Sequence, residues 1–245
     1  MENDIAITQA LVEYAWECIN SGDRKLREAV AMSLQATPEM LIILATDKVA
    51  TVRNLVARNP NAQPETIAAL AVDKARNVRL SVSQNPSTPE DVLLRFATTG
   101  ESALRINVAA NPGTTEKVLW MLSSDPYDQV RSELAKNPIS KDDLLGTLSA
   151  DATTKVRRSV AGNPNTAPVI LNVLGHDKQA AVRAAVAKNE RTHPATLLSL
   201  AIDDETQTVK LAALENPHTS LVAVNILAGR SRDRVSTELG NSKVI

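Results

Sequence analysis

Arginines recur through the chain at one fixed spacing. Each follows an aliphatic residue and lies 26 positions after the last, and a lysine continues the series after a step of 27. The members are Arg27, Arg53, Arg79, Arg105, Arg131, Arg157, Arg183 and Lys210. A stripe of cations at regular spacing is one way to hold nucleic-acid phosphates. The alternative is that each arginine pairs inside the protein.

Aspartates with the same period favour the second interpretation. They precede most of the arginines by six residues, and Thr99 interrupts the series. The members are Asp47, Asp73, Asp125, Asp151, Asp177 and Asp203. Each could pair with an arginine of its own unit or of a neighbouring one. A carboxylate just before a helix also accepts exposed backbone N–H groups and meets the positive helix end. We therefore predict a structural, charge-assisted ladder between units.

Asparagines form the third series, and all but Asn189 precede a proline. They are Asn59, Asn85, Asn111, Asn137, Asn163, Asn189 and Asn216. An asparagine side chain can bond to backbone groups in the turn that proline forces. We interpret the series as turn-forming rather than ligand-binding.

Other catalytic chemistry is sparse. The lone Cys18 excludes an internal disulfide and a thiolate metal site and is predicted to be a small buried hydrophobe, and three scattered histidines make no metal cage. No nucleophile, zinc or phosphate-loop motif occurs. With 27 basic and 28 acidic residues, the net charge of −1 disfavours a general polyanion binder. We predict no enzyme, no cofactor and no metal.

Hydrophobic spacing predicts two short helices in each unit. Val52 and Val56 lie four apart, and Ile67 and Leu70 lie three apart, so each pair shares a helical face. The first helix should end at or before Asn59, because the residue before a proline is pushed out of the α region. The second should begin near Pro64 or Glu65 and be either α or 3₁₀. Neither helix is long enough to be stable alone, so units must stack.

The segment LAVDKARNVRLSVSQNPSTPEDVLLRFA and its sister segments resemble the repeats of bacterial leucine-rich repeat variant proteins. The Asp and Val-Arg pattern also resembles HEAT and armadillo repeats. The resemblance implies an all-α, right-handed superhelical solenoid of about eight 26-residue, two-helix repeats, with α/α or α/3₁₀ units. It covers about residues 24–230. The N-terminal cysteine cluster of the variant family is not matched here, so no iron–sulfur cofactor is implied.

Positions that vary between units suggest a binding surface. On a helical wheel of the first helix, positions 51, 54, 55 and 58 lie opposite the recurring residues. In the resembled class this helix lines the concave side. We interpret the varying positions as a stripe that binds a partner, with an apolar half followed by a basic half. The candidate residues are Leu55, Leu80, Ile106, Lys136, Arg158 and Lys188. An ordinary solvated face with position 55 partly in the core is the alternative.

These observations predict one structural domain, with a helical cap at residues 1–23, the solenoid at 24–230 and a degenerate cap at 231–245. The predicted function is protein–protein interaction or scaffolding on the concave face, with an unidentified protein or peptide segment as partner. A nucleic-acid-binding solenoid is the alternative. The N-terminus lacks a basic, apolar leader, and no window reaches the ~18 apolar residues of a membrane span, so we expect a cytoplasmic protein.

Overall fold

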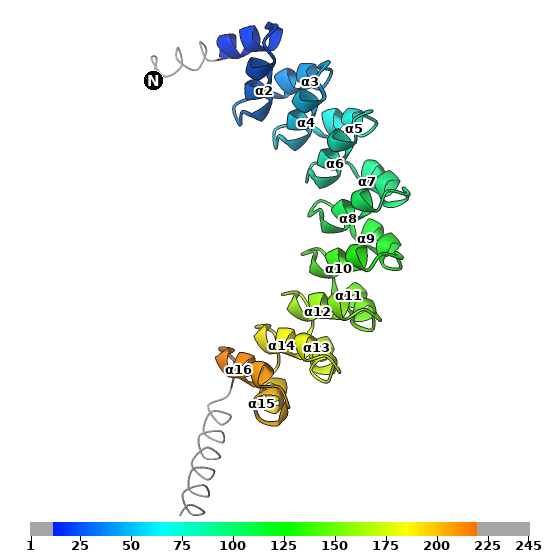
Figure 1. Cartoon of the computed structure of the whole chain (residues 1–245), viewed down its shortest axis with the longest axis vertical. Coiled ribbons are helices and arrows are strands. Elements are labelled where there is room, and N and C mark those ends of the chain that lie inside the picture. The colour runs from blue at the N-terminus through cyan, green and yellow to red at the C-terminus, as the bar shows by residue number, and fades with distance from the viewer. Residues whose placement is uncertain (1–11, 220–245) are drawn as a thin grey trace, which may run out of the picture. The chain divides into compact units, whose positions relative to one another are not determined.

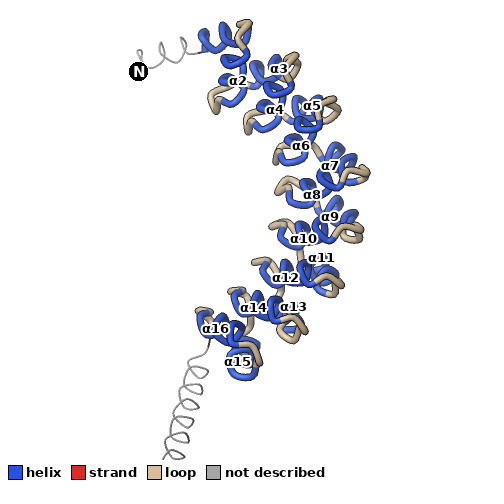
Figure 2. Tube along the Cα trace, viewed as in Figure 1, coloured by secondary structure: helices blue, strands red, loops and turns tan. Residues whose placement is uncertain are grey.

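The computed structural model describes residues 12–219, and every regular element among them is a helix (Figure 1). The chain divides into two compact units, Met1–Leu122 and Ser123–Ile245. Short loops join consecutive helices in both units (Figure 2). The predicted all-α tandem-repeat fold is confirmed.

Unit Met1–Leu122 alternates first and second helices after a helix at residues 12–20. The first helices are α2 (Arg24–Met32), α4 (Ala50–Arg58), α6 (Arg76–Gln84) and α8 (Ser102–Ala110). The second helices are α3 (Pro38–Leu44), α5 (Pro64–Leu70), α7 (Glu90–Ala97) and α9 (Glu116–Leu122). Consecutive first helices pack against one another, α2 on α4, α4 on α6 and α6 on α8 (Figure 1). Each second helix also packs on the first helix that follows it, α3 on α4, α5 on α6 and α7 on α8.

Unit Ser123–Ile245 repeats this arrangement. Its first helices are α10 (Asp128–Lys136), α12 (Thr154–Gly162), α14 (Ala180–Lys188) and α16 (Gln207–Glu215). Its second helices are α11 (Asp142–Ser149), α13 (Pro168–Leu174) and α15 (Pro194–Asp203). Here too the first helices pack in sequence, α10 on α12, α12 on α14 and α14 on α16.

Proline sets the ends of the helices as predicted. Helix α4 stops at Arg58, and its C-cap Asn59 is extended, with φ −74° and ψ 127°, because Pro60 excludes the α conformation from the residue before it. Helix α5 begins at Pro64, where a missing N–H costs no helical bond. The open question about the second helices is answered in favour of α for residues 12–219, where all seven second helices are α-helices of seven to ten residues.

The predicted apolar pairs form the core. Val52, Val56 and Ile67 are fully buried, and Leu70 is nearly so. Burial of one such side chain stabilises a fold by about 1.5–3 kcal/mol. Since each short helix contributes only a few of these side chains, the helices depend on their neighbours for stability.

One extra residue shifts the register late in the array. Helix α15 spans ten residues, whereas α11 spans eight and α13 seven. The assignment of Asp203 to the aspartate series is therefore wrong. Asp203 is the last residue of α15, and Asp204 takes the position equivalent to Asp177, accepting the backbone N–H of Thr206.

The predicted caps fall mostly beyond the part of the chain that the structure describes. Of the segment 1–23, residues 12–20 are helical, and Cys18 is a buried free thiol, as predicted. The segment 231–245 and the end of the predicted solenoid, 220–230, lie outside the described residues, so these boundaries stay predictions.

Candidate partner-binding face

The arginine and aspartate series form the predicted ladder, and the pairing crosses from one repeat to the next. Arg53 Nε donates to Asp73 Oδ2 at 2.5 Å, and its Nη2 donates to Oδ1 at 2.9 Å. The Arg53 Nη1 group binds the carbonyl oxygen of Asp47, six residues earlier in its own repeat. Equivalent ion pairs are Arg27–Asp47, Arg131–Asp151, Arg157–Asp177 and Arg183–Asp204.

Each ladder carboxylate also accepts a backbone N–H in the turn just before the helix that follows it. Asp47 Oδ1 accepts the N–H of Val49 at 2.7 Å, and Asp73 Oδ1 accepts that of Ala75 at the same distance. Val49 and Ala75 are the N-cap residues of α4 and α6. One carboxylate thus binds both an arginine and a helix N-terminus, as the sequence predicted.

Ion pairing in the ladder shifts the pKa of the carboxyl group and of the guanidinium group, as in the Arg53–Asp73 pair. The hydrogen bond from Arg53 is the main cause that lowers the pKa of Asp73, and burial opposes it. For Asp151, burial is the largest influence and by itself would raise the pKa, but the bonds from Arg131 and Thr153 together lower it. The same aspartate bond raises the pKa of Arg53. Both groups of the Arg53–Asp73 pair therefore stay ionised in the folded chain.

The asparagines also join neighbouring repeats, which the sequence did not predict. Asn85 Oδ1 accepts the N–H of Ser87, the expected turn. Its Nδ2 group donates to the carbonyl oxygens of Ala57 at 2.8 Å and Asn59 at 3.4 Å in the preceding repeat. Equivalent bonds run from Asn59, Asn111, Asn163, Asn189 and Asn216.

Threonine and serine hydroxyls form a further recurring series, which the sequence did not predict. Thr166 Oγ1 donates to the carbonyl oxygen of Val160 at 2.6 Å, within one repeat. The equivalent hydroxyl donors are Thr88, Thr114, Ser140, Thr192 and Thr219. Their recurrence every 26 or 27 residues was the available signal, hidden because Ala36 and Ala62 fill the position in the first repeats.

The variable positions of the first helices form what we call the first-helix face, positions 51, 54, 55 and 58 and their equivalents. The predicted apolar residues Leu55, Leu80 and Ile106 are half-buried on α4, α6 and α8. The predicted cations are exposed: Lys136, Arg158 and Lys188 lie on α10, α12 and α14. Their assignment to partner binding stays a prediction.

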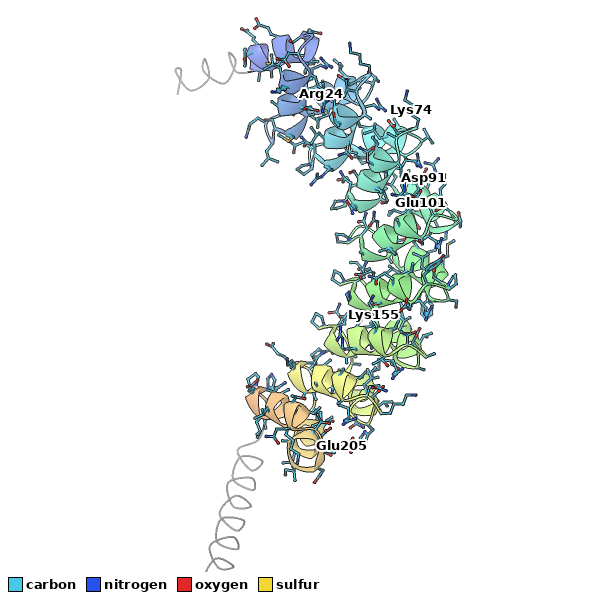
Figure 3. All side chains as sticks on the ribbon, in the orientation of Figure 1. Arg24, Lys74, Asp91, Glu101, Lys155 and Glu205 are labelled. Atoms are coloured by element: carbon cyan, nitrogen blue, oxygen red, sulfur yellow. The ribbon has the colours of Figure 1, made fainter. Side chains whose placement is uncertain are left out.

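The premise that these positions are free of contacts between repeats is wrong for part of the face. Thr51 Oγ1 donates to Glu28 Oε1 at 2.6 Å, and Ser81 Oγ donates to Asn54 Oδ1 at 2.7 Å. Lys155 of α12, labelled in Figure 3, donates to Gln129 of α10. Some residues of the first-helix face thus contact each other across repeats, although their types differ from one repeat to the next. Position 58 and its equivalents, by contrast, are exposed in every described repeat.

The cations of the face differ in their surroundings. Lys136 Nζ lies 2.9 Å from Glu133 Oε1, one turn away on the same helix. Arg158 and Lys188 have no hydrogen bond or ion pair with any residue in the described part of the chain. The basic half of the predicted stripe therefore depends mainly on these two residues.

The second helices carry larger exposed apolar side chains, which the repeat pattern did not indicate. Ile42, Met121, Val169 and Val173 are about half or more exposed, on α3, α9 and α13. Isolated apolar side chains of this kind are common on protein surfaces. Within residues 12–219, no three His, Cys, Asp or Glu side chains gather as metal ligands, and no helix has the length and apolar content needed to cross a bilayer.

The known proteins that this chain matches are solved structures. Neither a family model nor a curated protein sequence matches this chain. Among solved structures it is similar to a leucine-rich repeat variant that was described as having a novel repetitive structural motif. The TM-score is 0.55 and the identity 26%, over 83% of this chain and 80% of the other. With the repeated helix pairs, this similarity confirms the resemblance seen in the sequence: the chain is an all-helical tandem-repeat protein that is similar to the leucine-rich repeat variant.

Proposed function

We propose that the chain is a non-enzymatic interaction module that binds an acidic segment of another protein along the first-helix face. One observation carries the proposal. Arg158 and Lys188 are exposed and lack a partner among the described residues, whereas Arg157 and Arg183 on the same two helices are both paired with aspartates. Unpaired cations on a regular surface favour a partner with carboxylates.

Small residues beside these cations favour an extended partner. Gly162, Ala184 and Ala185 occupy the face between Arg158 and Lys188. A Cβ atom added at Gly162 would meet nothing within 4 Å, so the surface there is open. A peptide backbone can approach such a surface closely while its side chains reach the cations.

Half-buried aliphatic residues occupy the first-helix face of unit Met1–Leu122. Leu80 and Ile106 are equivalent positions of α6 and α8, and Leu55 is one position further along α4. Each is partly accessible, so a partner could bury the remainder and gain apolar contact. On unit Met1–Leu122 the proposed contacts are therefore apolar, whereas on unit Ser123–Ile245 they are with acidic residues.

Nucleic acid is the second candidate, and the ladder disfavours it. The described ion pairs neutralise Arg27, Arg53, Arg131, Arg157 and Arg183 inside the repeats. A phosphate backbone would find few of the recurring cations accessible. As part of the proposal we place the module in the bacterial cytoplasm, in keeping with the resemblance and with its single buried thiol.

Affinity capture with charge-reversed baits tests this proposal. The face variant carries Arg158→Glu and Lys188→Glu, and a matched control carries Arg95→Glu and Lys117→Glu on the second helices α7 and α9. Quantitative mass spectrometry should identify proteins that wild type and control retain and the face variant loses. Equal capture by both variants would show that the binding surface does not lie on the first-helix face.

The captured partner then allows affinity to be measured. Both variants should unfold within about 0.5 kcal/mol of wild type, because the mutated side chains are exposed. Leu80→Ala and Ile106→Ala should each weaken binding by about 1–2 kcal/mol, or roughly 5- to 30-fold in Kd. Binding to random duplex DNA that weakens steeply with salt would instead support the nucleic-acid candidate.

A further inference from the structure

The ladder has one exception within unit Met1–Leu122. Thr99, in the loop between α7 and α8, stands where the other repeats have an aspartate. Its Oγ1 hydroxyl donates to the carbonyl oxygen of Phe96 at 3.1 Å. The side chain is thus engaged with its own helix end, and it brings no carboxylate to the arginine of the preceding repeat, Arg79.

The donors that bind a carboxylate elsewhere are nevertheless present. In the Arg53–Asp73 pair, Arg53 Nε, Arg53 Nη2 and the N–H of Ala75 all bind one carboxylate. The equivalent donors here are Arg79 Nε, Arg79 Nη2 and the N–H of Glu101. Among the described residues, Arg79 Nε and the Glu101 N–H have no acceptor.

Glu101 is the nearest carboxylate, and it does not replace the aspartate. Its Oε2 atom lies 3.8 Å from Arg79 Nη2, beyond hydrogen-bond distance. Its Oε1 atom pairs with Nε of Arg76, a surface residue of α6. Two guanidinium groups therefore share one carboxylate, which leaves one net positive charge at this loop.

Solvent reaches this arginine more easily than its equivalents. The Arg79 side chain is 28% exposed, compared with 8% for Arg53. Arg79 Nη1 is held by the carbonyl oxygens of Asp73 at 2.8 Å and Lys74 at 3.2 Å. These bonds fix one side of the guanidinium group while Nε and Nη2 remain available to a ligand from solution.

We propose that this loop is an oxyanion site, in which a phosphate or carboxylate group binds Arg79 Nε and Nη2 and the N–H of Glu101. The bound group would complete the charge-assisted contact that aspartate provides in the other repeats. The site is independent of the first-helix face, because the ladder arginines belong to the constant side of the helix. Free phosphate and an acidic side chain of a partner share the required chemistry.

Thermal unfolding in inorganic phosphate, with sodium chloride at matched ionic strength as reference, tests the site. Phosphate should raise the wild-type midpoint by about 2–4 °C. Thr99→Asp should raise the midpoint without phosphate and remove the response to phosphate. Arg79→Gln should remove the response while leaving the other ion pairs intact. The double variant Thr99→Asp, Glu101→Gln controls for repulsion between the new carboxylate and Glu101.

A labelled hexaglutamate peptide distinguishes the two sources of the oxyanion. A response to phosphate alone identifies a free-anion site, and a response to the peptide alone identifies a site for a partner's carboxylate. Both results support the proposal if Arg79→Gln abolishes them. An equal phosphate response in wild type, Thr99→Asp and Arg79→Gln, or no response of wild type to either probe, would overturn it.

Discussion

The two sides of the first helices differ in how strictly their residues repeat. On α12, Arg157 binds Asp177 of the next repeat, and its side chain is 9% exposed. Arg158, the next residue in the chain, is exposed and has no partner in the described part of the protein. The same residue type recurs at positions whose side chains bond to an acceptor that recurs in the neighbouring repeat. The residue type varies at positions that face solvent.

A third group of residues contacts the neighbouring repeat but does not recur. Glu28 and Thr51, and likewise Asn54 and Ser81, bind each other across repeats although neither pair recurs elsewhere in the array. Contact between repeats therefore does not by itself fix a residue type. The residues that recur are those that also bind the backbone, because a carbonyl or N–H is the same in every repeat.

The largest expected effect separates the two adjacent arginines. Arg157→Ala leaves the buried carboxylate of Asp177 without its guanidinium group and should destabilise the chain by about 2–4 kcal/mol. Arg158→Ala, the matched control, should change stability by less than about 0.5 kcal/mol. Urea unfolding of the two variants measures the difference. Coincident midpoints would mean that the ladder does not stabilise the array.

A smaller effect is expected from the asparagine series. Asn85→Ala removes the donors to Ala57 and Asn59 and the acceptor for Ser87. Unpaired buried carbonyl oxygens should lower stability by about 1–3 kcal/mol. The control is Asn77→Ala, on the exposed side of α6, the helix whose C-cap residue is Asn85. It should leave the free energy of unfolding almost unchanged. If both asparagines prove neutral, the series serves only as a turn signal.

The smallest effect is a difference in acid sensitivity. The pKa of Asp73 is lowered chiefly by its bond from Arg53, so the folded chain binds fewer protons there than the unfolded chain. The stability this gives is complete above the unfolded aspartate pKa of about 3.9 and is lost as the pH falls through the folded pKa.

Thermal midpoints measured between about pH 5 and 3 test this linkage. The midpoint of Asp73→Asn should decline less steeply than that of wild type, since the variant has lost the titrating group. Asp91→Asn, which alters an exposed carboxylate of α7, should keep the wild-type slope. A wild-type slope in Asp73→Asn would show that this carboxylate is not linked to folding.

Much of the fold could be predicted because the signals are local. The Asn-Pro pairs set the end of most first helices, and prolines such as Pro64 set the start of several second helices, through backbone geometry alone. The direction of the arginine pairing could not be predicted. Asp47 is within sequence reach of both Arg27 and Arg53, and only the packing of repeats places its carboxylate against the former and its carbonyl against the latter.

The candidate face was harder to predict than the ladder. A helical wheel identifies which positions of α4 lie away from the core, but it does not show that Thr51 and Asn54 contact the adjacent helices. The misassigned Asp203 has a similar cause. An added residue within α15 cannot be located by counting, because Asp203 and Asp204 are adjacent and chemically alike.

Helix α15 carries a consequence for the evolution of the array. It contains the extra residue, yet Arg183 still binds an aspartate, Asp204, and Asn216 still binds the carbonyl oxygens of Ala187 and Asn189. The segment from ladder arginine to asparagine keeps its length while the second helix lengthens. A gene for such an array can therefore gain a codon in the second helix without loss of register, and we expect insertions and deletions among related sequences to concentrate there.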